Sequence, residues 1–295
     1  MEPISARYRD TIIKAIKHSR GQLEITPDNV YQAGNTTIVP FIEAILEENL
    51  EIGSTVRSIE NLVKLADLAA SGKSCLLLLE HYSNFDLPVF IYLLRKAGPE
   101  GVRIADSIVA IAGIKLSATN PIVTTFAEAY SRLVIYPSRS VEALKQGMRD
   151  PKALAEEMFK SNAINRATMK TLGELKTSGK LILVFPSGTR HRPWDPGTKR
   201  GVREIDSYLK SFDYMCLVSI NGNILRINPE GEMHEDLICR DKVIIDASEP
   251  LSCTEFRDKA KKGTSLGEDR KQAIVDALMV HLEEMHLAVE ASLKP

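Results

Sequence analysis

The chain has 295 residues, of which 44% are hydrophobic and 26% are charged, and these shares exclude a disordered or fibrous protein. The 38 Lys and Arg residues are balanced by 39 Asp and Glu residues, whereas nucleic-acid-binding proteins usually carry a clear basic excess. The composition therefore predicts a globular protein with a substantial core and no nucleic-acid partner.

Neither a membrane span nor a secretory signal is expected. The sequence has no run of about 18 uncharged apolar residues. Its first residues contain neither a long apolar stretch nor a small-residue cleavage site. The cysteines have no Cys-x-x-Cys spacing and are expected to be reduced thiols of a cytoplasmic enzyme: Cys75, Cys216, Cys239 and Cys253.

The N-terminal part of the chain has helical patterns. Apolar side chains recur at helical spacing in the first stretch, at Tyr8, Ile12 and Ile16. Thr26-Pro27 places a capping hydroxyl before a proline, which is typical of a helix start. Two further helices are predicted over 41–50 and 54–68. Because no strand is predicted among them, residues 1–72 are expected to form a small N-terminal helical bundle, a domain of its own.

From Lys73 onwards, short apolar runs alternate with helical patterns. Helices are predicted over 86–96 and 151–175, and again from Thr254 to the end of the chain. The alternation predicts an α/β domain over residues 73–295, with a mixed, mostly parallel central sheet flanked by helices. The apolar runs predicted to be its strands are 75–79, 107–112, 132–136, 181–185, 215–220 and 243–246.

His81 follows the predicted strand 75–79, and Asp86 stands five positions later at the start of a predicted helix. Ligands of open α/β sheets collect at the carboxyl ends of strands. The residues between His81 and Asp86 are enough to turn the chain, so the carboxylate can reach one ring nitrogen. Such a contact fixes the tautomer and makes the other nitrogen a better general base. Two plainer interpretations stay open: a structural histidine, and an aspartate that caps the helix.

Two further strand ends carry basic side chains. Arg190 and Arg192 follow the strand 181–185, and guanidinium groups match phosphate oxygens well. Arg139 follows the strand 132–136 and is a third candidate for a phosphate ligand. The alternatives are a solvated polar loop and, for Arg139, a surface charge. A tight turn with exposed backbone N–H groups is predicted at Ser187, Gly188 and Thr189.

Together, the three strand ends combine a His–Asp pair with three arginines. A base beside a phosphate clamp suits a phosphorylated alcohol as nucleophile, because the clamp positions the hydroxyl and the base removes its proton during attack on an acyl donor. No Gly-x-Ser-x-Gly motif occurs, which argues against a serine hydrolase built around Ser187. His234 and Asp236 near Cys239 match no common metal spacing, so neither a metal nor a redox cofactor is expected.

These motifs resemble those of the glycerolipid acyltransferase family. His81-Tyr-Ser-Asn-Phe-Asp86 resembles the His-x4-Asp box of that family, and Phe185-Pro-Ser-Gly-Thr-Arg190 resembles its Phe-Pro-Glu-Gly-Thr-Arg box. Ile135-Tyr-Pro-Ser-Arg139 resembles the basic block between them. The segment 216–220 lies where the apolar fourth block belongs.

One departure narrows the resemblance, because Ser187 stands where the family usually has glutamate. The form Pro-Ser-Gly-x-Arg-x-Arg-Pro at 186–193 resembles the soluble, plastid-type glycerol-3-phosphate acyltransferases. That resemblance implies acyl transfer from acyl-CoA or acyl carrier protein to the 1-hydroxyl of glycerol 3-phosphate. His81 is then the general base, Asp86 orients it, and the phosphate is held by Arg139, Arg190 and Arg192.

Several alternatives stay open at this point. The acceptor can instead be lysophosphatidate, the reaction can be thioester hydrolysis, or the chain can be a non-catalytic lipid- or carrier-binding protein of the same fold. The expected location is the cytoplasm, or the plastid stroma if a transit peptide has been removed. Residues 1–20 carry five basic and two acidic side chains, which fits either an ordinary bundle helix or peripheral contact with anionic lipid or an acidic carrier. His281 and His286 are expected on different faces of the C-terminal helix, as surface residues.

Overall fold

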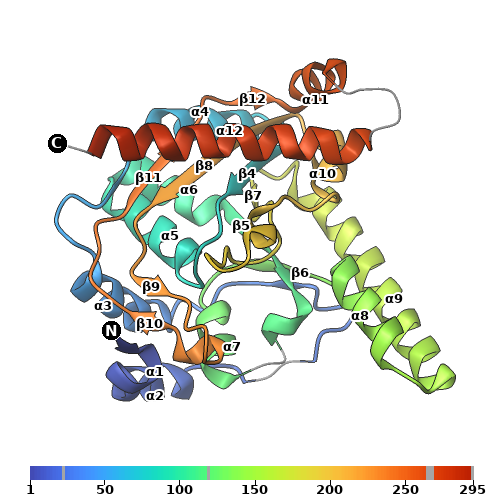
Figure 1. Cartoon of the computed structure of the whole chain (residues 1–295), viewed down its shortest axis with the longest axis horizontal. Helices are drawn as coiled ribbons and strands as arrows, with labels where there is room; N and C mark the ends of the chain where they lie inside the picture. Colours follow the sequence, from blue (N-terminus) through green and yellow to red (C-terminus); the bar gives the residue numbers. More distant parts are fainter. Residues whose placement is uncertain (22–23, 118–119, 264–268, 294–295) are drawn as a thin grey trace. The chain divides into compact units, whose positions relative to one another are not determined.

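The computed structural model describes residues 1–21, 24–117, 120–263 and 269–293. The chain divides into two compact units, and Figure 1 shows its course. The first unit comprises Met1–Tyr8, Glu43–Ile108 and Lys176–Pro295, and the second comprises Arg9–Ile42 and Val109–Leu175. Among the described residues, no helix is both long and apolar enough to cross a membrane.

The first unit is built on a mixed sheet with the strand order β7-β4-β8-β11-β3. Its central strand β4 (Cys75–Leu79) is parallel to both β7 (Leu181–Val184) and β8 (Tyr214–Asn221). On the other side of β8, β11 (Ile244–Ala247) runs antiparallel to β8 and parallel to β3 (Thr55–Val56). The predicted α/β fold with a mixed, mostly parallel sheet flanked by helices is confirmed.

Helices pack on this sheet and on one another. The long helix α12 (Arg270–Leu293) crosses β8 and β11 and contacts both (Figure 1). Helix α4 (Ile59–Ala70) packs on β4, β8 and β11. The other elements of this unit are β1 (Glu2–Pro3), α1 (Ile4–Arg7), α5 (Asp86–Lys96), α6 (Pro99–Ser107), α10 (Ile205–Ser211), β9 (Leu225–Arg226), β10 (Leu237–Ile238), β12 (Leu251–Ser252), α11 (Cys253–Lys262) and the 3-10 turns Pro196–Lys199 and Met233–Glu235.

In the second unit, β6 (Arg132–Ile135) pairs in parallel with β5 (Ile108–Gly113) and antiparallel with β2 (Tyr31–Gln32). Its longest helix, α9 (Pro151–Leu175), packs on β6. The remaining elements are α2 (Arg9–Lys17), a 3-10 turn at Ile114–Ser117, α7 (Pro121–Glu128) and α8 (Ser138–Gly147), while α3 (Val39–Asn49) begins in this unit and ends in the first.

Burial explains why β4 lies in the centre of its sheet. All five of its residues are buried, and Leu76 to Leu79 are 0% exposed. A strand that is covered on both faces has a continuous apolar sequence, as parallel strands in α/β proteins do. Each buried leucine contributes about 1.5–3 kcal/mol relative to an exposed one. The strand therefore holds the residues that follow it, Glu80 and His81, on a rigid base.

The N-terminal 72 residues are divided between the two units, because 1–8 and 43–72 belong to the first and 9–42 to the second. The predicted boundary at residue 72 does not coincide with a boundary between these units, and a separate N-terminal domain stays a prediction. This part of the chain also contains the short strands β1, β2 and β3, where no strand was expected.

Two predicted helix starts in this region are wrong for identifiable reasons. Thr26-Pro27 lies in a turn, because Asn29 Oδ1 accepts a hydrogen bond from the Thr26 backbone N–H at 2.8 Å and competes with a helix. Ser54 does not cap a helix either, since its Oγ accepts from the Val243 backbone N–H at 3.0 Å. That bond leads the chain into β3, and the helix begins only at Ile59.

Candidate active site

Two loops meet at the carboxyl ends of the neighbouring strands β4 and β7. The parallel register pairs Leu78 with Val184, so the chain leaves both strands at the same level. The backbone N–H of His191 donates to the carbonyl oxygen of His81 at 2.7 Å and joins the loops. The Phe185 ring stacks on the His81 ring, with centroids 3.9 Å apart and planes 20° apart. The fold therefore brings the His81 motif and the Phe185–Arg190 motif together, as predicted.

Asp86 is the first residue of α5 and folds back onto the preceding loop. Its Oδ2 lies 2.9 Å from His81 Nδ1, and it also accepts from the backbone N–H groups of Tyr82 at 2.6 Å and Ser83 at 2.9 Å. Its Oδ1 accepts from Ser83 Oγ at 2.9 Å. The side chain is 4% exposed, so four donors satisfy a buried carboxylate. All of these partners precede the helix, whose N-cap residue is Phe85 and has no side-chain cap, so Asp86 holds the loop at His81 and does not cap α5.

This contact decides the tautomer of His81. A carboxylate only accepts hydrogen bonds, so Nδ1 carries the proton and Nε2 keeps its lone pair. The side chain of His81 is 17% exposed. The aromatic stack with Phe185 and the bond to Asp86 hold the ring from two sides. An imidazole held in this way has the geometry of a general base.

The segment from Ser187 to Thr189 forms the predicted tight turn after β7. Gly188 has φ of +62°, which favours glycine, and its N–H donates to the Phe185 carbonyl at 2.9 Å. Ser187 Oγ donates to the Thr189 carbonyl at 2.7 Å. The turn is as expected, but the Gly188 N–H and the Ser187 hydroxyl are engaged inside it. Their predicted role as substrate donors stays a prediction.

The arginines of this loop have different surroundings. Arg190 is 9% exposed and forms an ion pair with Asp236, which is 1% exposed. Burial raises the pKa of Asp236, and Arg190 offsets part of that effect. Arg192 is half-buried, and within the described part of the chain no ion pair involves its guanidinium. Of the two guanidinium groups, that of Arg192 is therefore the more accessible.

Arg139, the third predicted arginine, belongs to the second unit. It is an exposed residue in the first turn of α8. Its predicted part in phosphate binding remains a prediction. Among the described residues, no group of three His, Cys, Asp or Glu side chains is close enough to hold a metal ion.

Sequence reasoning missed a buried cluster beside the His81 loop. Glu80 is 5% exposed, and its Oε2 lies 3.0 Å from Nδ1 of His286. Its Oε1 accepts from Tyr82 Oη at 2.9 Å. His286 was expected at the surface, but its side chain is only 16% exposed and faces the sheet. The spacing of five residues on a helix did predict that His281 and His286 lie on different faces.

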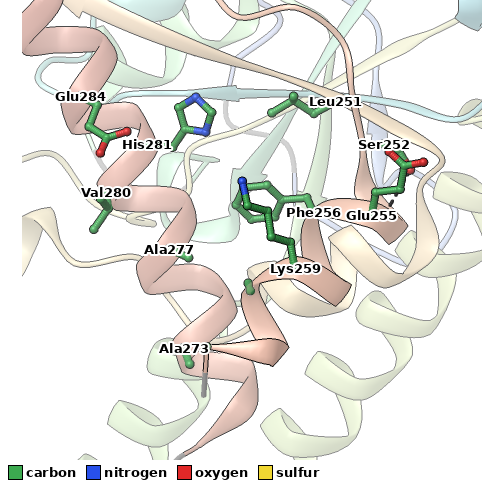
Figure 2. A pocket seen from close by; sticks show the side chains of 12 residues that line it. Leu251, Ser252, Glu255, Phe256, Lys259, Ala273, Ala277, Val280, His281 and Glu284 are labelled. Atoms are coloured by element: carbon green, nitrogen blue, oxygen red, sulfur yellow. Dashed lines mark hydrogen bonds between the residues drawn. The ribbon is translucent and has the colours of Figure 1, made fainter. Parts of the chain in front are cut away.

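A cavity of about 620 Å³ lies elsewhere, between α11 and α12. Figure 2 shows Phe256 and Lys259 on α11 opposite Ala277 and His281 on α12, across this space. None of the residues predicted to carry the chemistry lines it. His281 faces this cavity, on the side of α12 away from His286.

The chain is thus an α/β protein in which His81 and Asp86 are paired at the end of a central strand. The model of the acyltransferase family matches residues 53–235, which is more than half of the chain, and the chain belongs to this family. Among curated proteins no match is found.

One similar solved structure is the 1-acyl-sn-glycerophosphate (LPA) acyltransferase PlsC from Thermotoga maritima. It is 15% identical, the alignment covers 95% of this chain and 88% of that chain, and the TM-score is 0.39. A likeness of this size does not assign a substrate to this chain.

Proposed function

We propose that this acyltransferase moves an acyl group from a thioester of CoA or acyl carrier protein to the 1-hydroxyl of glycerol 3-phosphate. The observation that carries the proposal is the 2.9 Å contact between His81 Nδ1 and Asp86 Oδ2, which leaves Nε2 as a base. The membership of the acyltransferase family supports the reaction class. The proposed reaction uses no metal or redox cofactor.

In this reaction, His81 Nε2 removes the proton of the acceptor hydroxyl while the oxygen attacks the thioester carbonyl carbon. The tetrahedral intermediate then expels the thiolate as the C–S bond breaks. The imidazolium returns the proton to the sulfur, so the products are an ester and a free thiol. Asp86 favours proton uptake by His81 because its carboxylate lies against Nδ1, where the positive charge develops.

Glycerol 3-phosphate is proposed as the acceptor because basic side chains accompany the His–Asp pair. Arg192 and, through its remaining N–H groups, Arg190 are proposed to bind the phosphate, with Arg139 as a third ligand. Ser187 in place of the usual glutamate is the sequence feature that favours this acceptor over lysophosphatidate.

An acceptor assay tests the proposal. Purified protein is given acyl-CoA or acyl carrier protein thioester with radiolabelled glycerol 3-phosphate, with lysophosphatidate, or with no acceptor. Labelled lysophosphatidate in the first arm supports the proposed function. Conversion of lysophosphatidate alone moves the chain to the second acylation step. Thiol release without any acceptor identifies a hydrolase, and no reaction in any arm by folded protein favours a binding protein.

A further inference from the structure

The C-terminal helix α12 reaches the catalytic loop from outside the segment that matches the family. The match ends at residue 235, whereas α12 covers Arg270–Leu293. On the face of α12 turned to the sheet, Asn221 Nδ2 of β8 donates to the carbonyl oxygen of His286 at 3.0 Å. The His286 ring is therefore held at the end of β4 by backbone as well as side-chain contacts.

The ring of His286 lies between carboxylates. Its Nδ1 is 3.0 Å from Glu80 Oε2 and 3.3 Å from Tyr82 Oη, and its Nε2 is 3.5 Å from Glu290 Oε1. Burial alone lowers the pKa of His286, but the hydrogen bond and charge of Glu80 outweigh it and raise the pKa above the usual value. Lys199 is the cation that opposes this shift.

The buried carboxylate of Glu80 accepts hydrogen bonds from three donors. Besides His286 Nδ1, they are Tyr82 Oη and the backbone N–H of Ile220, at 2.9 and 2.8 Å. Burial raises the pKa of Tyr82, and the charge of Glu80 adds to that effect, so the phenol stays a donor. The same residue, Tyr82, donates its backbone N–H to Asp86 Oδ2 at 2.6 Å. A chain of direct contacts therefore runs from His286 through Glu80 and Tyr82 to Asp86 and His81.

We propose that His286 is a positioning residue for the reaction: through Glu80 and the Tyr82 hydroxyl it fixes the loop whose backbone N–H groups hold Asp86 against His81. The inference deepens the proposed function and rests on it for its kinetic readout. His286 touches neither His81 nor Asp86, so it acts only through the position of that loop.

The proposal has a distinct dependence on pH. Because the pKa of His286 is raised in the folded state, its charged bond to Glu80 is fully formed below the usual histidine value of about 6.5. The bond weakens as the pH rises through the raised pKa. The charged and titratable groups that face the ring are Glu80, Tyr82, Lys199 and Glu290. The effect of removing the imidazole should thus be largest at low pH and shrink in alkali.

The test compares His286→Ala with His286→Asn, whose amide nitrogen can replace Nδ1 as the donor to Glu80. His281→Ala is the matched control, because His281 is on the same helix but faces the cavity of Figure 2. Two quantities are measured at several pH values: kcat and KM for acyl transfer, and hydrogen exchange of the Tyr82 and Ser83 backbone N–H groups.

We expect His286→Ala to lower kcat about tenfold, the effect of one charge-assisted hydrogen bond, with KM values changed less than about twofold. The two amides should exchange about tenfold faster. His286→Asn should restore most of kcat and of the protection of the two amides. Tyr82→Phe should have the same effects as His286→Ala. The proposal is overturned if His286→Ala has the same amide exchange and kcat as His281→Ala. It is also overturned if the fall in kcat is the same at every pH and His286→Asn does not recover it.

The exchange measurement needs no substrate, so it separates this inference from the proposed function. If the wild-type protein acylates neither acceptor but the amides still loosen in His286→Ala, the proposed function fails and the positioning holds. If the wild-type protein acylates an acceptor but the amides of His286→Ala exchange no faster, the proposed function holds and the positioning role fails. Should His286→Ala not fold, His286→Asn and Tyr82→Phe provide the same comparison.

Discussion

The substitution Asp86→Asn removes a buried charge and keeps the shape of the side chain. An amide oxygen in the place of Oδ2 still accepts from His81 Nδ1 and from the N–H groups of Tyr82 and Ser83. The amide nitrogen then faces Ser83 Oγ, whose hydroxyl can rotate to accept instead of donating. We therefore expect the variant to fold, with only the negative charge beside His81 lost.

The distance in the structure sets the size of the effect. At 2.9 Å, Coulomb's law with an effective dielectric constant of about 20 gives about 6 kcal/mol between imidazolium and carboxylate. This is a ceiling, because water screens the 17% exposed imidazole and the amide dipole replaces part of the interaction. A loss of about 2–4 kcal/mol corresponds to a fall in kcat of roughly 30- to 1000-fold.

The assay is the rate of acyl transfer to radiolabelled glycerol 3-phosphate at saturating concentrations of both substrates. KM should change little, because Asp86 is buried on the Nδ1 side of His81, whereas Nε2 is the atom proposed to meet the acceptor. Asp106→Asn, a change of an exposed aspartate on α6, is the matched control and should leave kcat unaltered. A kcat for Asp86→Asn within about threefold of wild type, in folded protein, refutes the role of the carboxylate charge.

Two further predictions concern charge. Arg192→Ala should raise the KM for glycerol 3-phosphate at least about tenfold and leave the melting temperature unchanged. Arg190→Ala leaves Asp236 buried without its cation and should cost about 3 kcal/mol of stability. Thermal unfolding and steady-state kinetics of both variants distinguish these effects, and identical behaviour of the two variants is evidence against the different roles assigned to the two arginines. Hydrogen bonds from the Ser74 backbone and hydroxyl lower the pKa of Asp213, so its stabilisation is present above the usual aspartate pKa and is lost as the pH falls through the lowered value. Asp213→Asn should accordingly be less stable than wild type in denaturant titrations at neutral pH and indistinguishable from it in strong acid.

The strands and helices that position the site were predictable because their sequences carry strong local signals. The run at β4 is uninterrupted and apolar, and it is bounded by Gly72 and Glu80. Helices α5 and α9 begin and end where their apolar patterns and prolines indicate. The strands that went unnoticed, such as β3, have two residues each, which is too short for a periodic pattern.

The contact between His81 and Asp86 was predictable for a different reason, since the two residues are close in sequence and a single turn joins them. The contacts that sequence reasoning missed join residues far apart in the chain. Arg190 and Asp236 are 46 positions apart, and Glu80 and His286 are 206 positions apart. No local pattern marks such pairs, because the fold alone brings them together. A glutamate at the end of a wholly buried strand was the one available hint that Glu80 needs a cationic or donor partner.

The measurement that tests the account most directly is acyl transfer by His81→Ala beside the wild-type protein, with binding of glycerol 3-phosphate followed by calorimetry. The account predicts that wild type forms labelled lysophosphatidate and that the variant loses this turnover while binding the acceptor with nearly unchanged affinity. Near-normal turnover by folded His81→Ala would show that another group removes the proton.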